Sequence, residues 1–99
     1  MFKLMYLPLA NVDLKNIDIY IARDNPLKAD EFVAYLQEQI ERLRDFPNLG
    51  VPEKCPSFLP NSRKLIIKNY IAHYSVYEKE QRIVVTRVLH GSVQNYKLV

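Results

Sequence analysis

The spacing of the apolar residues changes along this 99-residue chain, from a helical period in the first half to a strand period in the second. Between residues 11 and 45, apolar residues recur at intervals of three and four, the period of one face of an α-helix. Between residues 63 and 89, Ile, Val and Tyr dominate and the period is two, as in β-strands. The chain is therefore expected to adopt an α+β fold, with helices packed on a sheet.

Two helices are predicted in the first half, and the short turn between them makes them an antiparallel hairpin. The first should begin at Asn11 as its N-cap, with Asp13 in its first turn, where the helix dipole favours negative charge. The second has a clearer start, because Asn25 can cap it and Pro26 suits the first helical position. It should end before Pro47. Its apolar stripe consists of Ala29, Phe32, Val33, Leu36, Ile40 and Leu43.

Strands are predicted on both sides of the hairpin. Residues 2–6 form a short apolar run that suits an edge strand, and residues 47–61, which hold four of the six prolines, should form a loop. Residues 63–68, 70–77 and 82–89 read as three strands joined by short connections, which makes them an antiparallel meander. The expected order is β-α-α-β-β-β, with the helical hairpin packed on one face of a small, mainly antiparallel sheet.

The faces of this sheet can be assigned in part. Alternation places four residues of the middle strand on one face, namely Tyr70, Ala72, Tyr74 and Val76. The last strand is apolar on both faces, which indicates an interior position. The face away from the helices should carry Lys64, Lys68 and some of the tyrosines, unless the last residues of the chain or a partner cover it.

Length and composition predict one domain over residues 1–99, since two domains would each lack a sufficient core. The only cysteine, Cys55, excludes an internal disulfide, fits a reducing compartment, and is expected to be a spare thiol. The apolar start of the chain is too short for a signal peptide, and no apolar run reaches membrane-spanning length. We expect a soluble, cytoplasmic protein that does not enter a membrane.

The net charge of +3 is unevenly distributed. Residues 11–45 contain five basic and eight acidic side chains, whereas residues 46–99 contain eight basic and three acidic ones. A basic second half suggests an anionic partner, either nucleic acid or an acidic protein. An uneven but functionally neutral surface explains the same numbers equally well.

Motifs for the common kinds of catalytic site are absent from the sequence. His73 and His90 have no neighbouring ligands at metal-binding spacing, and neither a phosphate-binding glycine loop nor a Ser-His-Asp arrangement can be argued. No cofactor or metal is therefore expected. A basic and aromatic set remains on the strands, and it could hold phosphates and stack bases. It consists of Arg63, Lys64, Lys68, Tyr70, Tyr74, Arg87, His90 and Tyr96.

Each member of this set also has a structural interpretation. In a nuclease, His90 would transfer a proton and Arg87 would neutralise charge on the phosphorane. Alternating tyrosines, however, more often line the rim of a core, and His73 is better explained as a hydrogen-bonded strand residue. Arg63 and Arg87 border apolar strands, so each must find a carboxylate or a phosphate.

Four segments in order resemble ParE-type toxins of the RelE/ParE superfamily. Residues 8–21, with the pair Asp13-Leu14, resemble the start of the first helix, and residues 43–50 resemble the end of the second. Arg63-Lys64-Leu65, followed by Asn69-Tyr70 and Tyr74, is similar to the strand hairpin of that family. Residues 87–91, Arg-Val-Leu-His-Gly, resemble the motif that closes its last strand. The set spans nearly the whole chain.

The resemblance implies a type II toxin that a cognate antitoxin, ParD-like or similar, holds inactive. Only the antitoxin would contact operator DNA. An acidic C-terminal antitoxin segment would be steered toward the basic second half of this chain. It could add to an exposed sheet edge or lie in a groove beside the helices. For that groove the resemblance and the apolar pattern indicate Leu14, Ile17, Ile21 and Tyr70.

The two branches of the superfamily differ in their target. RelE-like members cut mRNA on the ribosome, whereas ParE-like members block DNA gyrase. Where such nucleases often carry arginine, this chain has Ile71 and Ser92, which favours the ParE branch and a toxin that inhibits gyrase. A surface for toxicity or an anionic partner would contain Arg63, Lys64, Lys68, Arg87 and His90. The alternative is a ribosome-dependent endoribonuclease that uses Lys64, Arg87, His90 and Tyr96, and a further alternative is a degenerate member that binds antitoxin without toxicity.

Overall fold

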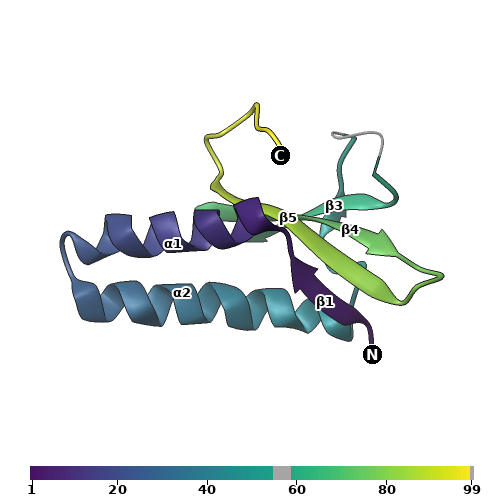
Figure 1. Cartoon of the computed structure of the whole chain (residues 1–99), viewed down its shortest axis with the longest axis horizontal. Helices are drawn as coiled ribbons and strands as arrows, with labels where there is room; N and C mark the ends of the chain where they lie inside the picture. Colours follow the sequence, from purple (N-terminus) through teal and green to yellow (C-terminus); the bar gives the residue numbers. More distant parts are fainter. Residues whose placement is uncertain (55–58, 99) are drawn as a thin grey trace.

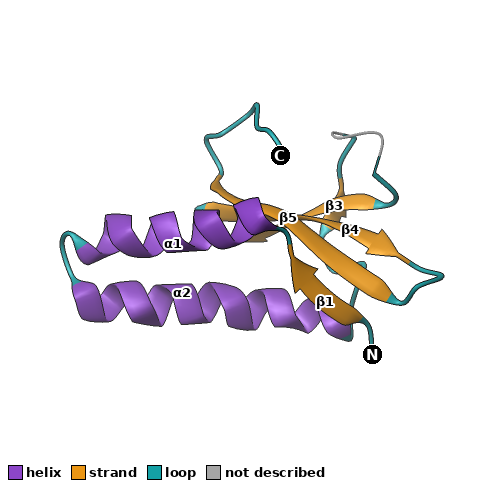
Figure 2. Cartoon of the chain, viewed as in Figure 1, coloured by secondary structure: helices purple, strands orange, loops and turns teal. Residues whose placement is uncertain are grey.

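The computed structural model describes residues 1–54 and 59–98, so Cys55 lies outside the described residues. Two helices pack on a five-stranded mixed sheet (Figures 1 and 2). This confirms the predicted class and the order β-α-α-β-β-β, with one short strand added in the loop. In chain order the elements are β1 (Lys3–Tyr6), α1 (Pro8–Ala22), α2 (Pro26–Glu41), the 3₁₀ turn η1 (Arg42–Arg44), β2 (Val51–Pro52), β3 (Ser62–Ile67), β4 (Tyr70–Tyr77) and β5 (Arg82–His90).

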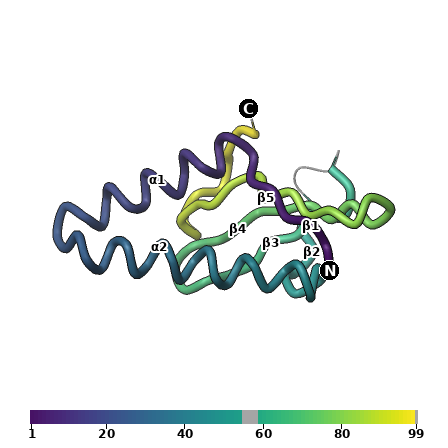
Figure 3. The backbone as a smooth tube through the Cα atoms, turned by 60° about the horizontal axis from the view of Figure 1, so that its bottom comes forward, coloured from purple at the N-terminus to yellow at the C-terminus, as the bar shows by residue number. Residues whose placement is uncertain are grey.

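The strand order across the sheet is β1-β5-β4-β3-β2. The meander β3-β4-β5 is antiparallel as predicted, and β5 lies in the interior of the sheet because β1 joins its other side. β1 runs parallel to β5, with Met5 beside Val84. The antiparallel hairpin of α1 and α2 lies along one face, and its closed end projects beyond the sheet (Figures 1 and 3). We call the face that these helices cover the helix face, and the opposite one the outer face.

The two helix starts differ in how well the sequence predicts them. Asn25 caps α2 as expected, with its side-chain oxygen accepting a hydrogen bond from the Lys28 amide at 3.1 Å. α1, however, begins at Pro8 rather than after Asn11, because the Leu7 amide still donates to Val85 and the chain passes directly from β1 into the helix. The prediction of an Asn11 cap is therefore wrong. Asp13 lies inside the helix and is buried, not in the first turn.

The core fills the space between the hairpin and the helix face. Its fully buried members include Ala10, Leu36, Ile40, Leu43, Ala72, Tyr74, Val76, Ile83, Val85 and Val88. The predicted face of β4 is confirmed, since Ala72, Tyr74 and Val76 are buried there and Tyr70 packs against the same cluster. The Tyr74 hydroxyl accepts from the Gly50 amide at 2.9 Å and donates to the Pro47 carbonyl at 2.8 Å. Tyr74 thereby anchors the loop that follows η1, and it has no surface available for stacking bases.

The outer face is covered in part by two segments that follow other elements. Glu53 and Leu59 belong to the loop between β2 and β3, and Tyr96 and Leu98 belong to the C-terminal segment after β5. This second segment returns toward the beginning of α1 (Figures 1 and 3). Lys64 lies on the outer face as predicted, but Lys68 does not. Lys68 occupies the β3–β4 turn with a φ of 54°, and its ammonium lies 5.4 Å from the ring centroid of Tyr35 on α2.

Candidate functional site

Three basic side chains lie in one line across the outer face. The strand registers place Lys64 of β3 beside His73 of β4, and His73 beside Arg87 of β5. Neighbouring residues across antiparallel strands point to the same side of the sheet, so the three side chains share the outer face. We call Lys64, His73 and Arg87 the basic row. It brings together three basic side chains that are distant in sequence.

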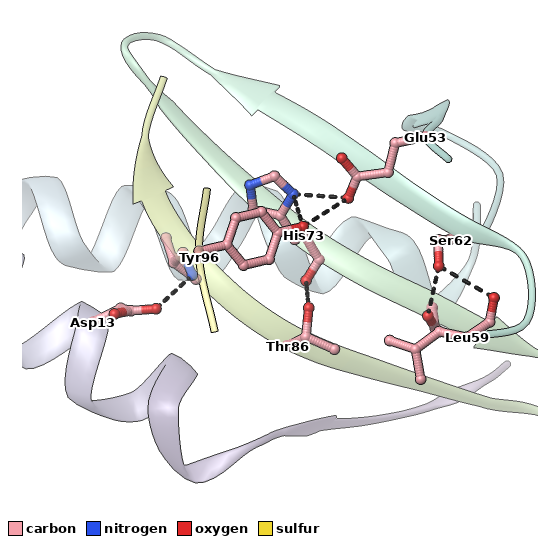
Figure 4. Close-up of polar contacts among 9 residues, drawn as sticks. Asp13, Glu53, Leu59, Ser62, His73, Thr86 and Tyr96 are labelled. Atoms are coloured by element: carbon pink, nitrogen blue, oxygen red, sulfur yellow. Dashed lines mark hydrogen bonds and ion pairs between the residues drawn. The ribbon is translucent and has the colours of Figure 1, made fainter. Parts of the chain in front are cut away.

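A β-bulge brings Arg87 into the basic row. The register between β4 and β5 passes from His73–Arg87 to Tyr74–Val85, which leaves Thr86 without a partner residue. The Thr86 hydroxyl donates to the His73 carbonyl at 3.1 Å and so satisfies a backbone group at the irregularity (Figure 4). Without the extra residue, strict alternation would turn Arg87 toward the helix face. A period-two pattern read from sequence does not reveal this change.

His73, in the middle of the row, is enclosed. The residue is 6% exposed, and its Nδ1 lies 2.7 Å from Oε1 of Glu53. The ring of Tyr96 packs over it with the centroids 4.5 Å apart and a tilt of 37°, and the Tyr96 hydroxyl lies 3.1 Å from Nδ1 (Figure 4). The expectation that His73 is a hydrogen-bonded strand residue is consistent with this geometry. The sequence did not indicate that Glu53 and Tyr96 would be its partners.

Arg87 is paired with a carboxylate from α1. Its Nε and Nη2 donate to the two oxygens of Asp13 at 2.7 and 2.9 Å, a bidentate ion pair. The hydrogen bonds and charge of Asp13 raise the pKa of Arg87 above its ordinary value, although burial acts in the opposite direction. Asp13 Oδ2 also accepts from the Val88 amide at 3.0 Å, on the side of β5 that β1 no longer covers. One carboxylate thus neutralises Arg87 and accepts a hydrogen bond from the Val88 amide at the edge of β5.

The C-terminal segment completes the enclosure. Arg87 Nη1 donates to the carbonyl of Lys97. Lys97 follows Tyr96, whose ring covers His73. In the basic row, Arg87 therefore hydrogen-bonds to a carboxylate and a carbonyl, and His73 contacts a carboxylate and a phenol. In the described part of the chain Lys64 has no carboxylate partner. Of the two cations Lys64 and Arg87, Arg87 is therefore neutralised by Asp13, whereas Lys64 is not neutralised by any described residue.

The other residues proposed from sequence do not join this row. His90 pairs in register with Tyr70 on the helix face, where the two rings meet edge-on at 5.4 Å. The His90 Nδ1 is 2.8 Å from the Ser92 hydroxyl. Among the described residues Arg63 pairs with no carboxylate, and its guanidinium donates to the Asn61 side chain and to the Gly50 carbonyl at 2.7 Å. Lys64, Arg87 and Tyr96 are thus brought together, whereas Arg63 and Lys68 lie elsewhere, and His90 meets Arg87 only along the wall of a shallow groove.

A second candidate surface lies where the hairpin projects past the sheet. Of the residues proposed for an antitoxin groove, Leu14 and Ile17 are each 6% exposed and belong mainly to the core, whereas Ile21 and Tyr70 are partly buried. Shallow grooves of about 350 and 450 Å³ lie beside them. The shared lining residues are Tyr20, Tyr70 and His90, and Tyr20 is 67% exposed. We call this surface the hairpin groove.

Within residues 1–54 and 59–98, no group of three His, Cys, Asp or Glu side chains is placed to hold a metal ion. Neither described helix has the length and apolarity needed to span a membrane.

Comparison with known proteins identifies the family. The family model of the ParE toxin of the parDE type II toxin–antitoxin system matches residues 4–95. This chain belongs to the ParE toxin family. The resemblance seen in the sequence is therefore confirmed, and the protein is a toxin of a type II toxin–antitoxin system. No match was found among curated proteins.

Solved structures agree with membership of the ParE family. A chain of the chromosomal ParDE toxin–antitoxin system from P. aeruginosa is 26% identical, with a TM-score of 0.73 over 91% of this chain and 96% of that one. A chain of the RelBE2 toxin–antitoxin complex from Mycobacterium tuberculosis is 17% identical, with a TM-score of 0.61 over 90% and 96%. The second similarity extends to the fold alone.

Two residues that organise this toxin's outer face, Asp13 and Glu53, were not recognised from sequence as parts of a site. Asp13 could have been found, because it lies three residues after Ala10 and four before Ile17, on the buried stripe of its helix. An acidic residue in such a stripe requires a cationic or hydrogen-bonding partner. Glu53 gave no comparable signal, since it stands in a proline-rich loop without periodicity.

Proposed function

We propose that this ParE-family toxin acts in the cytoplasm by inhibiting DNA gyrase and is held inactive by a ParD-like antitoxin bound at the hairpin groove. The observation that carries the proposal is the bidentate pair between Arg87 and Asp13, at 2.7 and 2.9 Å. It neutralises Arg87, the cation that a nuclease was expected to use against the charge of the phosphorane. A toxin that works by binding a protein target needs no such free charge.

Further geometry argues against RNA cleavage. Catalysis of phosphodiester cleavage needs a proton-transfer group and uncompensated positive charge around one phosphate. His90, the proposed proton-transfer group, lines one shallow groove together with Arg87, but Asp13 in that groove neutralises Arg87, and Lys64 lies on the outer face. Ile71 lies on the outer face beside Leu89, and Ser92 hydrogen-bonds to His90. Neither residue supplies the positive charge that arginine often provides at these two positions in RelE-like nucleases.

A gyrase assay with purified components tests the proposal. The toxin is added to gyrase, ATP and relaxed plasmid, and the DNA is released with detergent. We expect supercoiling to be lost and linear plasmid to accumulate with toxin concentration. The matched control is toxin premixed with equimolar antitoxin, which should restore supercoiling. Unchanged supercoiling at a tenfold excess of active toxin, meaning toxin that arrests growth when induced, would exclude gyrase as the target.

One observation favours the endoribonuclease as a second candidate. His73 is oriented by Glu53 at 2.7 Å and has Tyr96 and Lys64 beside it, and a histidine oriented by a carboxylate is a common proton-transfer unit. If the toxin were a nuclease, induction would produce codon-positioned cuts in translated transcripts without DNA breaks. His73→Gln would abolish the cuts while the unfolding midpoint in urea stayed within the range of active variants. A chain that binds antitoxin but causes neither effect would be the degenerate member of the family.

A further inference from the structure

An apolar cavity opens on the outer face beside β1. Its volume is about 460 Å³, which lies within the range of pockets that take small ligands. It shares no lining residue with the hairpin groove, and no member of the basic row lines it. We call it the edge cavity. Six residues make most of its wall: Met5, Leu7, Leu59, Tyr77, Val84 and Leu98.

The wall of the edge cavity suits an alkyl chain. Among the six wall residues Tyr77 alone carries an aromatic ring, so an aromatic ligand would find few rings to stack on. An alkyl chain needs no such geometry, because its gain on burial follows the apolar area that leaves water. Met5 remains 44% exposed at the mouth. A ligand can therefore enter without local unfolding.

Charged side chains gather at one end of the cavity. Arg82 and Glu80 line it there, and Lys3 is the neighbour of Arg82 in the parallel register of β1 and β5. Across residues 1–54 and 59–98, none of these three side chains forms an ion pair. Two cations and one carboxylate leave a net charge of +1 at this end. The charge favours a ligand with one negative group.

The length of the cavity limits the length of the ligand. Arg82 and Thr86 both line it, four residues apart on β5, and a strand of that length spans about 13 Å. An extended covalent chain covers about 3.5 Å with three bonds, so about ten carbons reach equally far. The Thr86 hydroxyl already donates to the His73 carbonyl, so Thr86 offers no free donor at the end away from Arg82. The apolar end of the ligand belongs there.

We propose that the edge cavity binds a free, unbranched fatty carboxylate with a chain of about eight to ten carbons. The carboxylate meets Lys3 and Arg82, and its charge-assisted hydrogen bonds to the guanidinium orient the ligand. The alkyl chain lies along the outer side of β5, covered by Leu59 and Leu98. The inference concerns a small-molecule site, and it depends neither on the target of the toxin nor on where the antitoxin binds.

Other ligands match the cavity less well. A nucleotide carries several charges and a polar sugar, whose hydrogen bonds to water the apolar wall would not replace. A second copy of this chain would present its own β1, with the sequence Lys-Leu-Met-Tyr, which contains no carboxylate for Lys3 and Arg82. An alkyl alcohol would fill the cavity but leave both cations without a counter-charge.

A series of chain lengths tests the size of the site. The full-length toxin is titrated calorimetrically with hexanoate, octanoate, decanoate and dodecanoate, each below its micelle concentration. Complete burial of one methylene strengthens binding about fourfold. Because the mouth is open, we expect saturable binding that tightens at least threefold for every two carbons up to decanoate. From decanoate to dodecanoate the gain should be less than twofold, since the added carbons extend beyond the cavity.

Charge at the rim is tested on both the protein and the ligand. Arg82→Gln should weaken decanoate binding threefold or more, and Glu80→Gln should strengthen it, because the two changes alter the rim charge in opposite directions. Arg23→Gln, which removes an exposed arginine in the turn after α1, is the matched control and should leave binding unchanged. 1-Octanol should bind at least threefold more weakly than octanoate.

The wall is tested by shortening one leucine. Leu98→Ala should weaken decanoate binding at least threefold, whereas Leu27→Ala, at a position 76% exposed at the start of α2, should not change it. Urea unfolding verifies that each variant is folded. Equal effects of the two leucine variants, rim variants that shift affinity in the same direction, or an undiminished gain from decanoate to dodecanoate would overturn the proposal. So would the absence of saturable decanoate binding to a toxin that unfolds normally.

Discussion

Asp13 shows how much a single buried carboxylate can stabilise in this fold. It is 7% exposed and accepts from the guanidinium of Arg87 and from the amide of Val88. Removing one partner of a buried ion pair leaves the other without compensation, which costs about 3–5 kcal/mol. We expect Asp13→Ala to lower the free energy of unfolding by about 3 kcal/mol, near the low end of that range because Arg87 keeps its bond to the Lys97 carbonyl. Urea denaturation followed by circular dichroism measures the change.

Two further variants separate this pair from general effects of charge. Asp24→Ala removes an exposed carboxylate in the turn that follows the same helix and should change stability by less than about 0.5 kcal/mol. Asp13→Ala combined with Arg87→Met should recover part of the loss, because no buried charge is then left unpaired. If Asp13→Ala unfolded at the same urea concentration as the unmodified toxin, the ion pair would have no structural role.

The partly buried phenol of Tyr6 should make the free energy of unfolding depend on pH in the alkaline range. Burial, followed by the charge of Glu41, raises the pKa of Tyr6 from 10.0 to about 12. Below pH 10 the phenol is protonated in both the folded and the unfolded chain. Between pH 10 and 12 only the unfolded chain loses the proton, so the unfolded state is favoured and the free energy of unfolding falls. After allowance for partial exposure, the loss attributable to Tyr6 is about 1–2 kcal/mol.

Replacing Tyr6 by Phe should therefore flatten the pH dependence in this window. Urea unfolding at pH 8, 10 and 11.5 measures it, and Tyr35→Phe, at a more exposed position, is the control that should retain the slope. Equal slopes for Tyr6→Phe and the unmodified toxin would contradict the assignment.

At the scale of elements, the backbone of the loop after η1 packs closely against β3 and β4 at Gly50. A Cβ on Gly50 would lie 2.6 Å from the Lys64 carbonyl oxygen and 2.8 Å from the Tyr74 hydroxyl. Backbone cannot move aside cheaply, so Gly50→Ala should cost about 1–3 kcal/mol. Gly91 provides the matched control, since a Cβ there would meet its nearest atom at 3.4 Å. We expect Gly91→Ala to stay within about 0.5 kcal/mol. Thermal or urea unfolding of both variants decides the matter, and similar losses would show that Gly50 has no special packing role.

The sequence predicted those elements whose signals are local. Asn25 and Pro26 identify the start of α2 because capping depends on neighbouring residues, and alternation gives the buried face of β4 because it reflects the pleat. The beginning of α1 was missed because it is set by the bond from Leu7 to Val85, between residues distant in sequence. The bulge at Thr86 was invisible for a related reason. It adds a residue without changing the apolar composition of β5, yet it decides that Arg87 faces outward.

The candidate site was predicted less completely than the fold, because its geometry depends on pairs of distant residues. Arg87 was recognised as a cation that must find a carboxylate or a phosphate, and it found Asp13 on α1. His73 was recognised as a hydrogen-bonded residue, but its partner Glu53 lies 20 residues away in an irregular loop. Charge type can be read from one position in the sequence, whereas the distance between two side chains requires the fold.

At the scale of the whole molecule, the acidic first half and the basic second half partly neutralise each other. Asp13, in the acidic half, is the bidentate partner of Arg87 in the basic half. The uneven charge of the sequence therefore overstates the field available to an anionic partner. This favours recognition by shape and apolar contact at defined surfaces, such as the hairpin groove, over long-range attraction to nucleic acid.

The proposed role of the hairpin groove leads to a comparison of two exposed apolar residues. Tyr20 lines the groove and is 67% exposed, while Ile66 on β3 is 62% exposed on the outer face. A lysine at either position should fold normally, since neither side chain is buried. Because a cation in the groove would be desolvated by the antitoxin, Tyr20→Lys should weaken antitoxin binding at least tenfold, about 1.4 kcal/mol or more. Ile66→Lys should leave it unchanged. Titration calorimetry measures the affinity, and induction in cells that express antitoxin should restore growth arrest for Tyr20→Lys alone. Escape of Ile66→Lys from neutralisation, with Tyr20→Lys still neutralised, would instead place the antitoxin on the outer face.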